Sequence, residues 1–351
     1  MLTGTVFPFS AHFDKHHILQ TLVTKDVPVN SVSIPTHENH WDEISLHCYE
    51  NTNYINEEME KERDHFVTAF GRKGKQVGEF EDAKDLVCLP DGGLVVTDMV
   101  IGRLQKFYNN ASTVTLLGPE DVTHPWSVTL TNENNIAVSL CKERCVRVLS
   151  RDGERLLSFG EDHLQSPAGI ACDRHGRFIV CDSKAGNVSM FDSTGLFMRH
   201  LGNHDKKEQS FSNPRYVCVS IKGEIIVADS GHHKVKIFNE NGDLVRSFGS
   251  FGKEDGQFKC PYGVCTDKFG TIYVADHYNS RISLFSSDGT FLRHLVTHDH
   301  GLLHPKGVKV DGNLYMYVTH GHLKATEVVI FKRSNIFNSI DFDTHDIISY
   351  V

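Results

Sequence analysis

The sequence repeats one phrase six times, and this repetition constrains the fold more than any other feature. In each copy a short apolar run ends at Asp or its equivalent, a polar loop follows, and a second apolar run closes at Phe or Leu. The Asp-equivalent positions are 98, 140, 182, 229, 276 and 320, spaced by 42, 42, 47, 47 and 44 residues. A Pro-x-Gly-like element at 83, 125, 167, 214, 261 and 305 has the same spacings. Two markers that drift together indicate six true repeats.

Each repeat contains four short runs of β-branched or alternating character, separated by Gly and Asp turns, and no helical periodicity of useful length. In the fifth repeat these runs are residues 262–266, 271–275, 281–285 and 290–295. Four antiparallel strands in a unit of 40 to 47 residues are typical of a propeller blade. The sequence therefore predicts an all-β fold, a six-bladed β-propeller of four-stranded antiparallel blades.

A propeller must close into a ring, because open first and last sheets would expose unpaired strand edges. No fourth strand of the expected type follows Phe331. Residues 66–71 instead match the fourth-strand endings at 157–160 and 245–249. We therefore expect residues 66–70 to be the outer strand of the last blade, so that an N-terminal strand closes the ring.

These repeats resemble the NHL-repeat β-propellers, in particular those of the TRIM-NHL and RING-NHL proteins. Residues 70–80 and 248–258 share the pattern Phe-Gly-x-x-Gly-x-x-x-Gly-x-Phe. The segment 261–264, Pro-Tyr-Gly-Val, leads on to Ala-Asp-x-x-Asn-x-Arg-Ile at 275–282. The likeness covers roughly residues 62–335. It weakens in repeat two, with Leu140 at the Asp position, and in repeat six, with His320 there.

The resemblance implies a non-catalytic recognition module without a cofactor. Such propellers bind single-stranded or stem-loop RNA in post-transcriptional regulation, or recruit protein clients for an E3 ubiquitin ligase. Full-length relatives carry a RING, whose zinc sites need closely spaced Cys and His ligands. Residues 1–60 contain only Cys48, so no RING is expected in this chain. RNA, or a protein client or RING-type ligase, is the partner implied.

Charge divides the chain into three segments. We expect an acidic N-terminal arm at 1–61, with a short helix near 56–63, the propeller at 62–335 and an acidic tail at 336–351. The net charge is −9 for the whole chain but close to neutral for the propeller, so the acidic total does not exclude nucleic acid. No secretory signal, membrane span or Cys-x-x-Cys pair is apparent. A cytoplasmic location with reduced thiols is therefore expected.

In a four-stranded meander, the loop that enters the first strand and the loop between strands two and three lie on one face. Basic and aromatic residues gather in these loops, whereas the hairpin turns of the other face are rich in Asp and Glu. Cations that neutralise phosphates, interleaved with aromatic rings that stack on bases, suit single-stranded nucleic acid. The residues predicted to bind RNA or a partner are Lys84, Arg103, Trp126, Lys142, Arg144, Lys184, Arg215, Tyr216, Lys234, Tyr262, Tyr278, Arg281 and Lys306.

Other interpretations of these motifs remain open at this stage. Arg103 and Arg281 could pair with the Asp five residues earlier and only pin a loop, and the aromatic residues could pack inward. The same face would also suit an acidic protein. Four cysteines, at 88, 172, 218 and 265, are expected at matching places in the first strand of four blades, as small buried apolar groups. Histidine pairs at 232–233, 298–300 and 320–322 permit a remote alternative, a zinc-dependent propeller lyase.

Overall fold

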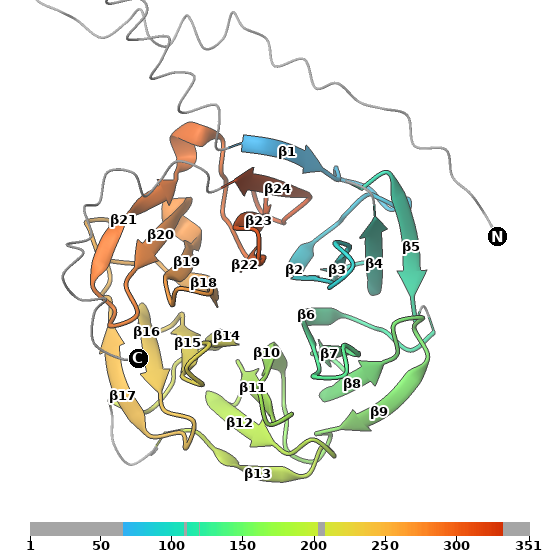
Figure 1. Cartoon of the computed structure of the whole chain (residues 1–351), viewed down its shortest axis with the longest axis horizontal. Coiled ribbons are helices and arrows are strands. Elements are labelled where there is room, and N and C mark those ends of the chain that lie inside the picture. Colours follow the sequence, from blue (N-terminus) through green and yellow to red (C-terminus); the bar gives the residue numbers. More distant parts are fainter. Residues whose placement is uncertain (1–65, 109–110, 119, 203–207, 333–351) are drawn as a thin grey trace, which may run out of the picture. The chain divides into compact units, whose positions relative to one another are not determined.

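The computed structural model describes residues 66–108, 111–118, 120–202 and 208–332. These residues form six four-stranded antiparallel sheets arranged radially around a common centre (Figure 1). The prediction of an all-β, six-bladed β-propeller is confirmed. The N-terminal arm, its expected helix and the acidic tail lie outside the described residues. Within the described ranges, no helix is long and apolar enough to cross a membrane.

Blades one to three each consist of four strands in sequence order, from the innermost strand to the outermost. Blade one contains β2 (Ala83–Cys88), β3 (Leu94–Asp98), β4 (Arg103–Tyr108) and β5 (Thr113–Leu117). Blade two contains β6 (Pro125–Leu130), β7 (Ile136–Leu140), β8 (Cys145–Leu149) and β9 (Arg155–Phe159). Blade three contains β10 (Pro167–Cys172), β11 (Phe178–Asp182), β12 (Asn187–Phe191) and β13 (Phe197–His200).

Blades four and five repeat this order, and blade six completes its sheet with the first strand of the chain. Blade four contains β14 (Pro214–Val219), β15 (Ile225–Asp229), β16 (Lys234–Phe238) and β17 (Leu244–Phe248). Blade five contains β18 (Pro261–Thr266), β19 (Ile272–Asp276), the 3₁₀ helix η1 (His277–Asn279), β20 (Arg281–Phe285) and β21 (Phe291–Val296). The 3₁₀ helix η2 (His298–His300) precedes blade six, which contains β22 (Val308–Val310), β23 (Tyr315–His320), β24 (Glu327–Lys332) and β1 (Phe66–Phe70).

Strand β1 closes the ring, as the sequence predicts. It pairs antiparallel with β24, through Phe70 with Val328 and Ala69 with Val329. The Phe70 ring also packs against Phe107 of blade one, with ring centroids 4.7 Å apart. One strand therefore joins blade six to blade one through both backbone pairing and apolar packing.

The recurring Asp at the end of the second strand anchors the entry loop of its own blade. The carboxylate of Asp182 accepts a hydrogen bond from the backbone N–H of Ser166 at 3.0 Å, and Asp229 accepts one from Ser212 at 2.8 Å. These carboxylates are fully buried, and buried polar groups require such partners. In blade six, His320 Nδ1 takes this place and accepts from the N–H of Leu303.

Neighbouring blades are joined near the centre by hydroxyl groups and by close backbone contact. Thr97 on β3 donates a hydrogen bond to the Trp126 carbonyl of the next blade at 3.0 Å, and Thr319 on β23 donates to the Lys84 carbonyl at 3.3 Å. At Gly263 a Cβ would lie 2.3 Å from the Lys306 carbonyl oxygen. Only glycine permits this approach of the inner strands of blades five and six.

Candidate functional site

Residues at the start of the inner strands form a compact group at the centre of the ring. Lys84, Trp126, Arg215, Tyr262 and Lys306 each follow the Ala or Pro that marks their repeat. Because the marker occupies the same place in every blade, these side chains approach one another from different blades. We call the group the central cluster and define it as Asp82, Lys84, Trp126, Arg215, Tyr216, Tyr262, His277, His304 and Lys306.

Aromatic rings and the Arg215 guanidinium form a continuous stack through the central cluster. The guanidinium carbon of Arg215 lies 4.4 Å from the Tyr262 ring centroid and 5.5 Å from that of Trp126. The Tyr262 ring stacks on the His277 ring with centroids 4.2 Å apart, and the His277 and His304 ring centroids are 5.3 Å apart. Arg215 is thus held between two aromatic faces, an arrangement that fixes the plane of a guanidinium.

Two lysines of the cluster share one carboxylate. Lys306 Nζ lies 2.6 Å from Asp82 Oδ1, and Lys84 Nζ lies 2.9 Å from Asp82 Oδ2. Burial alone would raise the pKa of Asp82, but the two ammonium groups outweigh it and lower that pKa. Burial and the neighbouring Lys84 lower the pKa of Lys306 to about 8. Asp82 is not among the residues predicted from the sequence, although its position directly before the repeat marker could have indicated it.

Arg215 differs from these lysines because no described residue gives it an anionic partner. Its Nε is buried without a hydrogen-bond partner, and so is Trp126 Nε1. No hydrogen bond or ion pair joins its terminal nitrogens to any described residue. Buried donors in native proteins are nearly always satisfied, so unpaired ones call for a ligand, an ion or water. Both donors belong to the same stack.

Tyr216 connects two blades that lie three positions apart in the ring. Its hydroxyl group donates a hydrogen bond to the Lys84 carbonyl, from β14 in blade four to β2 in blade one. The side chain is 2% exposed, and burial raises the pKa of the phenol. Tyr216 was predicted as part of a binding surface, and the structure places it beneath that surface as a bridge across the centre.

The other predicted residues lie in the strand-two-to-three loops around the central cluster. Lys142, Arg144 and Lys184 are exposed, Lys234 is partly buried, and Tyr278 is 54% exposed. We call these five residues the rim. Their side chains are available to a ligand, whereas most of the central cluster is buried.

Arg103 and Arg281 are each 7% exposed and bonded internally. Arg281 Nε lies 2.9 Å from Asp276 Oδ2, and its terminal nitrogens donate to the carbonyls of Lys253 and Gln257. Arg103 donates in the same way to entry-loop carbonyls, including that of Lys75 at 2.9 Å. The structure supports the loop-pinning interpretation of these arginines, and their guanidinium groups are not part of the binding surface.

Acidic residues of the entry loops correct the prediction of a uniformly basic face. The entry loops lie on the same face as the strand-two-to-three loops and carry acids of their own. Exposed acids of these loops are Glu120, Glu161, Asp162, Glu208, Glu254, Asp255 and Asp299. The face is therefore mixed in charge at its edge, and Arg215 is an unpaired cation at its centre.

The histidine pairs named for a zinc site are engaged in separate local contacts. His232 Nδ1 lies 2.8 Å from Asp229 Oδ2, His233 Nδ1 accepts from the Cys260 N–H, and His320 Nε2 lies 3.2 Å from Glu327. In the part of the chain that the structure describes, no three His, Cys, Asp or Glu side chains are grouped to hold a metal ion.

The cysteine prediction is wrong about equivalent positions, and Cys88 and Cys172 are only partly buried. Cys88 and Cys172 pair with the first residue of the following strand, whereas Cys218 and Cys265 pair with the second. A shift of one residue turns a side chain to the other face of its strand, so the four are not equivalent. Burial raises the pKa of the Cys88 and Cys218 thiols to about 12, which keeps them protonated at neutral pH.

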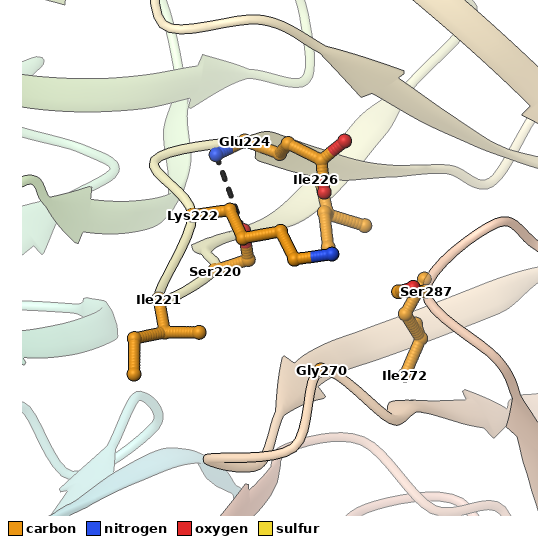
Figure 2. Close-up of a pocket in the computed structure, with 8 residues that line it drawn as sticks. All are labelled: Ser220, Ile221, Lys222, Glu224, Ile226, Gly270, Ile272 and Ser287. Atoms are coloured by element: carbon orange, nitrogen blue, oxygen red, sulfur yellow. Dashed lines mark hydrogen bonds between the residues drawn. The ribbon is translucent and has the colours of Figure 1, made fainter. Parts of the chain in front are cut away.

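A shallow hollow lies on the opposite face, between the hairpin turns of blades four and five (Figure 2). The turn from Ser220 to Glu224 forms one side, and Gly270 and Ser287 form the other. The space is smaller than a typical small-molecule site. Its ionisable residues are Lys222 and Glu224, and Glu224 pairs with Arg246. We therefore place the candidate site at the central cluster and rim.

Comparison with known proteins supports the repeat assignment. The model of the NHL repeat matches residues 211–238, which span β14 to β16 of blade four. The chain is a six-bladed β-propeller that carries an NHL repeat. No curated protein matches this propeller sequence. A TRIM-NHL relationship in particular remains an expectation.

Similar solved structures share the propeller fold at low identity. A Bacteroides thetaiotaomicron protein of unknown function has a TM-score of 0.62 and 15% identity, covering 76% of each chain. A gluconolactonase from Xanthomonas campestris has a TM-score of 0.57 and 14% identity, covering 76% of this chain and 98% of its own. Virginiamycin B lyase from Staphylococcus aureus has a TM-score of 0.56 and 10% identity, covering 72% of this chain and 81% of its own. At these identities the likeness shows the fold alone.

The buried His277 gives the central cluster a testable pH dependence. Burial, reinforced by the charges of Lys306 and Arg215, lowers the pKa of His277 to about 4, although its hydrogen bond to the Pro305 carbonyl opposes this. Below pH 6.5 the unfolded chain binds a proton that the folded chain excludes. We therefore expect this histidine to lower the free energy of unfolding by up to about 3 kcal/mol as the pH falls from about 6.5 to about 4.

Urea denaturation at pH 7 and pH 4.5, for the wild type and for His277→Gln, measures this effect. The wild type should lose more stability between the two pH values than the variant, because the variant lacks the titrating group. An identical loss in both proteins would mean that His277 is not held neutral by its surroundings.

Proposed function

We propose that this propeller is a recognition module that binds RNA, single-stranded or at the loop of a stem-loop, through the central cluster and rim. Post-transcriptional regulation is the cellular role that fits such a module. The observation that carries the proposal is Arg215, a cation stacked between Trp126 and Tyr262 with no anionic partner among the described residues. Phosphate groups pair with arginine, and unpaired bases stack on exposed rings such as Tyr278.

The rim supplies the second part of the argument. Lys142, Arg144, Lys184 and Lys234 extend from blades two, three and four, on the face that carries Arg215. A strand that crosses the centre would meet a cation in each of these blades. Each phosphate neutralised releases counterions, so affinity should fall steeply as salt rises.

Titration of a short U-rich single strand and of a U-rich hairpin, at about 50 mM and about 200 mM salt, tests the proposal. We expect clear binding at the lower concentration and a loss of about tenfold or more at the higher one. Absence of binding at about 50 mM salt, or an affinity that ignores salt, would contradict RNA recognition by this face.

The mixed charge of the face favours one other candidate, a protein client held for a RING-type ubiquitin ligase. The entry-loop acids would pair with basic residues of a client, while Arg215 would pair with an acid. Affinity purification with and without nuclease separates the two. Recovery of the same protein after nuclease treatment supports recruitment of a client, and its loss after nuclease supports RNA.

A further inference from the structure

The central cluster contains more positive than negative charge. Its cations are Lys84, Arg215 and Lys306, and its carboxylate is Asp82, so cations exceed acids by two when Lys, Arg and Asp are counted. Below them, Asp85 and Lys309 offset each other. Burial would lower the pKa of Lys309, but the nearby Asp85 carboxylate prevails and raises it. The uncompensated charge thus lies in the upper layer, around Arg215.

The unpaired donors lie in the same layer. Arg215 Nε and Trp126 Nε1 are both buried without a hydrogen-bond partner among the described residues. The guanidinium carbon of Arg215 lies 5.5 Å from the Trp126 ring centroid. Lys84 Nζ lies 4.8 Å from the Trp126 ring centroid. Two unsatisfied N–H donors beside an excess of positive charge are what an oxyanion requires.

The Tyr216 bridge restricts how a strand can use this place. Its side chain crosses from blade four to the Lys84 carbonyl of blade one, directly beside the charged layer. A strand that enters at the centre therefore meets this side chain as a floor. A chain end can direct its terminal group at this floor, whereas the middle of a strand must lie across the rim.

We infer that the central cluster is an oxyanion subsite that takes the terminal phosphate monoester of a bound RNA strand, in preference to an internal phosphodiester. A terminal phosphate carries a charge of about −1.5 to −2 at neutral pH and has three acceptor oxygens. It matches the excess charge of the cluster and offers three acceptor oxygens to its two unpaired donors. An internal phosphodiester carries one charge and has two free oxygens. This inference rests on the proposed RNA recognition.

The test uses the full chain and three oligonucleotides of one U-rich sequence, with free hydroxyl ends, a 5′-phosphate or a 3′-phosphate. We expect one phosphorylated form to bind about tenfold more tightly than the unphosphorylated strand. Which end is preferred identifies the source of the phosphate. Equal affinity for all three strands would overturn the subsite and leave the proposed function standing.

Variants separate the centre from the rim. Trp126→Phe keeps an aromatic ring but removes Nε1–H, and Arg215→Lys keeps the charge but removes the planar pair of donors. Both should reduce the preference for the phosphorylated strand to about threefold or less. Lys142→Ala, at the rim, should weaken the binding of all three strands equally and leave the preference for the phosphorylated strand unchanged. A preference that survives both central changes would contradict the assignment.

Inorganic phosphate provides an arm that does not depend on RNA. Millimolar phosphate should raise the melting temperature of the wild type at constant ionic strength, and should raise that of Arg215→Lys much less. If no RNA strand binds but this difference is present, the proposed function fails and the oxyanion subsite stands. If phosphate has no effect on the wild type and the strands do not differ, the subsite is excluded.

Discussion

A chain that begins at Gly71 is expected to lose most of the stability of the propeller, whereas one that begins at residue 62 keeps β1 and serves as its matched control. Without β1, the backbone of β24 loses its antiparallel partner from Val328 to Phe331. Phe107 loses the Phe70 ring. We expect the free energy of unfolding to fall by about 5 kcal/mol or more, which is comparable with the whole stability of many domains.

Urea denaturation followed by circular dichroism compares the two chains. The shorter chain should unfold at a much lower midpoint, or aggregate through the exposed edge of β24. Single substitutions refine the comparison. Phe70→Ala should lower the free energy of unfolding by about 2 to 3 kcal/mol because the ring packs on blade one. Phe66→Ala should lower it less, because Phe66 is 49% exposed. Equal midpoints for the two chains would show that β1 does not close the ring.

The architecture could be predicted because the repeat carries it locally. Turn residues and alternating apolar runs specify each strand. In blade five, no end of a predicted strand differs from the observed end by more than one residue. The closing strand was visible because residues 66–70 match other fourth strands. Blade six shows the limit of this method, since β22 begins at Val308, three residues after the Pro305 marker.

The candidate site could be predicted only in part, because its contacts join residues far apart in the sequence. The repeat register assigned Lys84, Trp126, Arg215, Tyr262 and Lys306 to one face, and the structure shows that they meet near the centre. It could not show that Asp82 neutralises the two lysines, or that Tyr216 crosses the ring. Nor does position after the repeated Asp reveal burial. Arg281 follows such an Asp, yet its guanidinium is bonded to Asp276 and to carbonyl groups of its own entry loop.

The second large effect is expected from Arg215→Glu. The substitution replaces the unpaired cation of the central cluster with an anion, in a partly buried place beside two aromatic rings. A phosphate would then meet repulsion instead of a paired, charge-assisted hydrogen bond. We expect the affinity for RNA at about 50 mM salt to fall by about a hundredfold or more, and the salt dependence to become less steep.

Lys222→Glu is the matched control for this change. It alters the net charge by the same amount, but Lys222 is an exposed residue of the pocket on the opposite face. Its effect on RNA affinity should be less than about threefold. Circular dichroism and melting temperature of both variants establish that they are folded, so that a loss of binding reports on the site.

The most direct test of the account is the RNA affinity of the wild type, Arg215→Glu and Lys222→Glu, measured side by side at two salt concentrations. We expect tight, salt-sensitive binding by the wild type and by Lys222→Glu, and near-complete loss in Arg215→Glu. If Arg215→Glu binds as the wild type does, or if both variants lose affinity equally, the central cluster is not the RNA site.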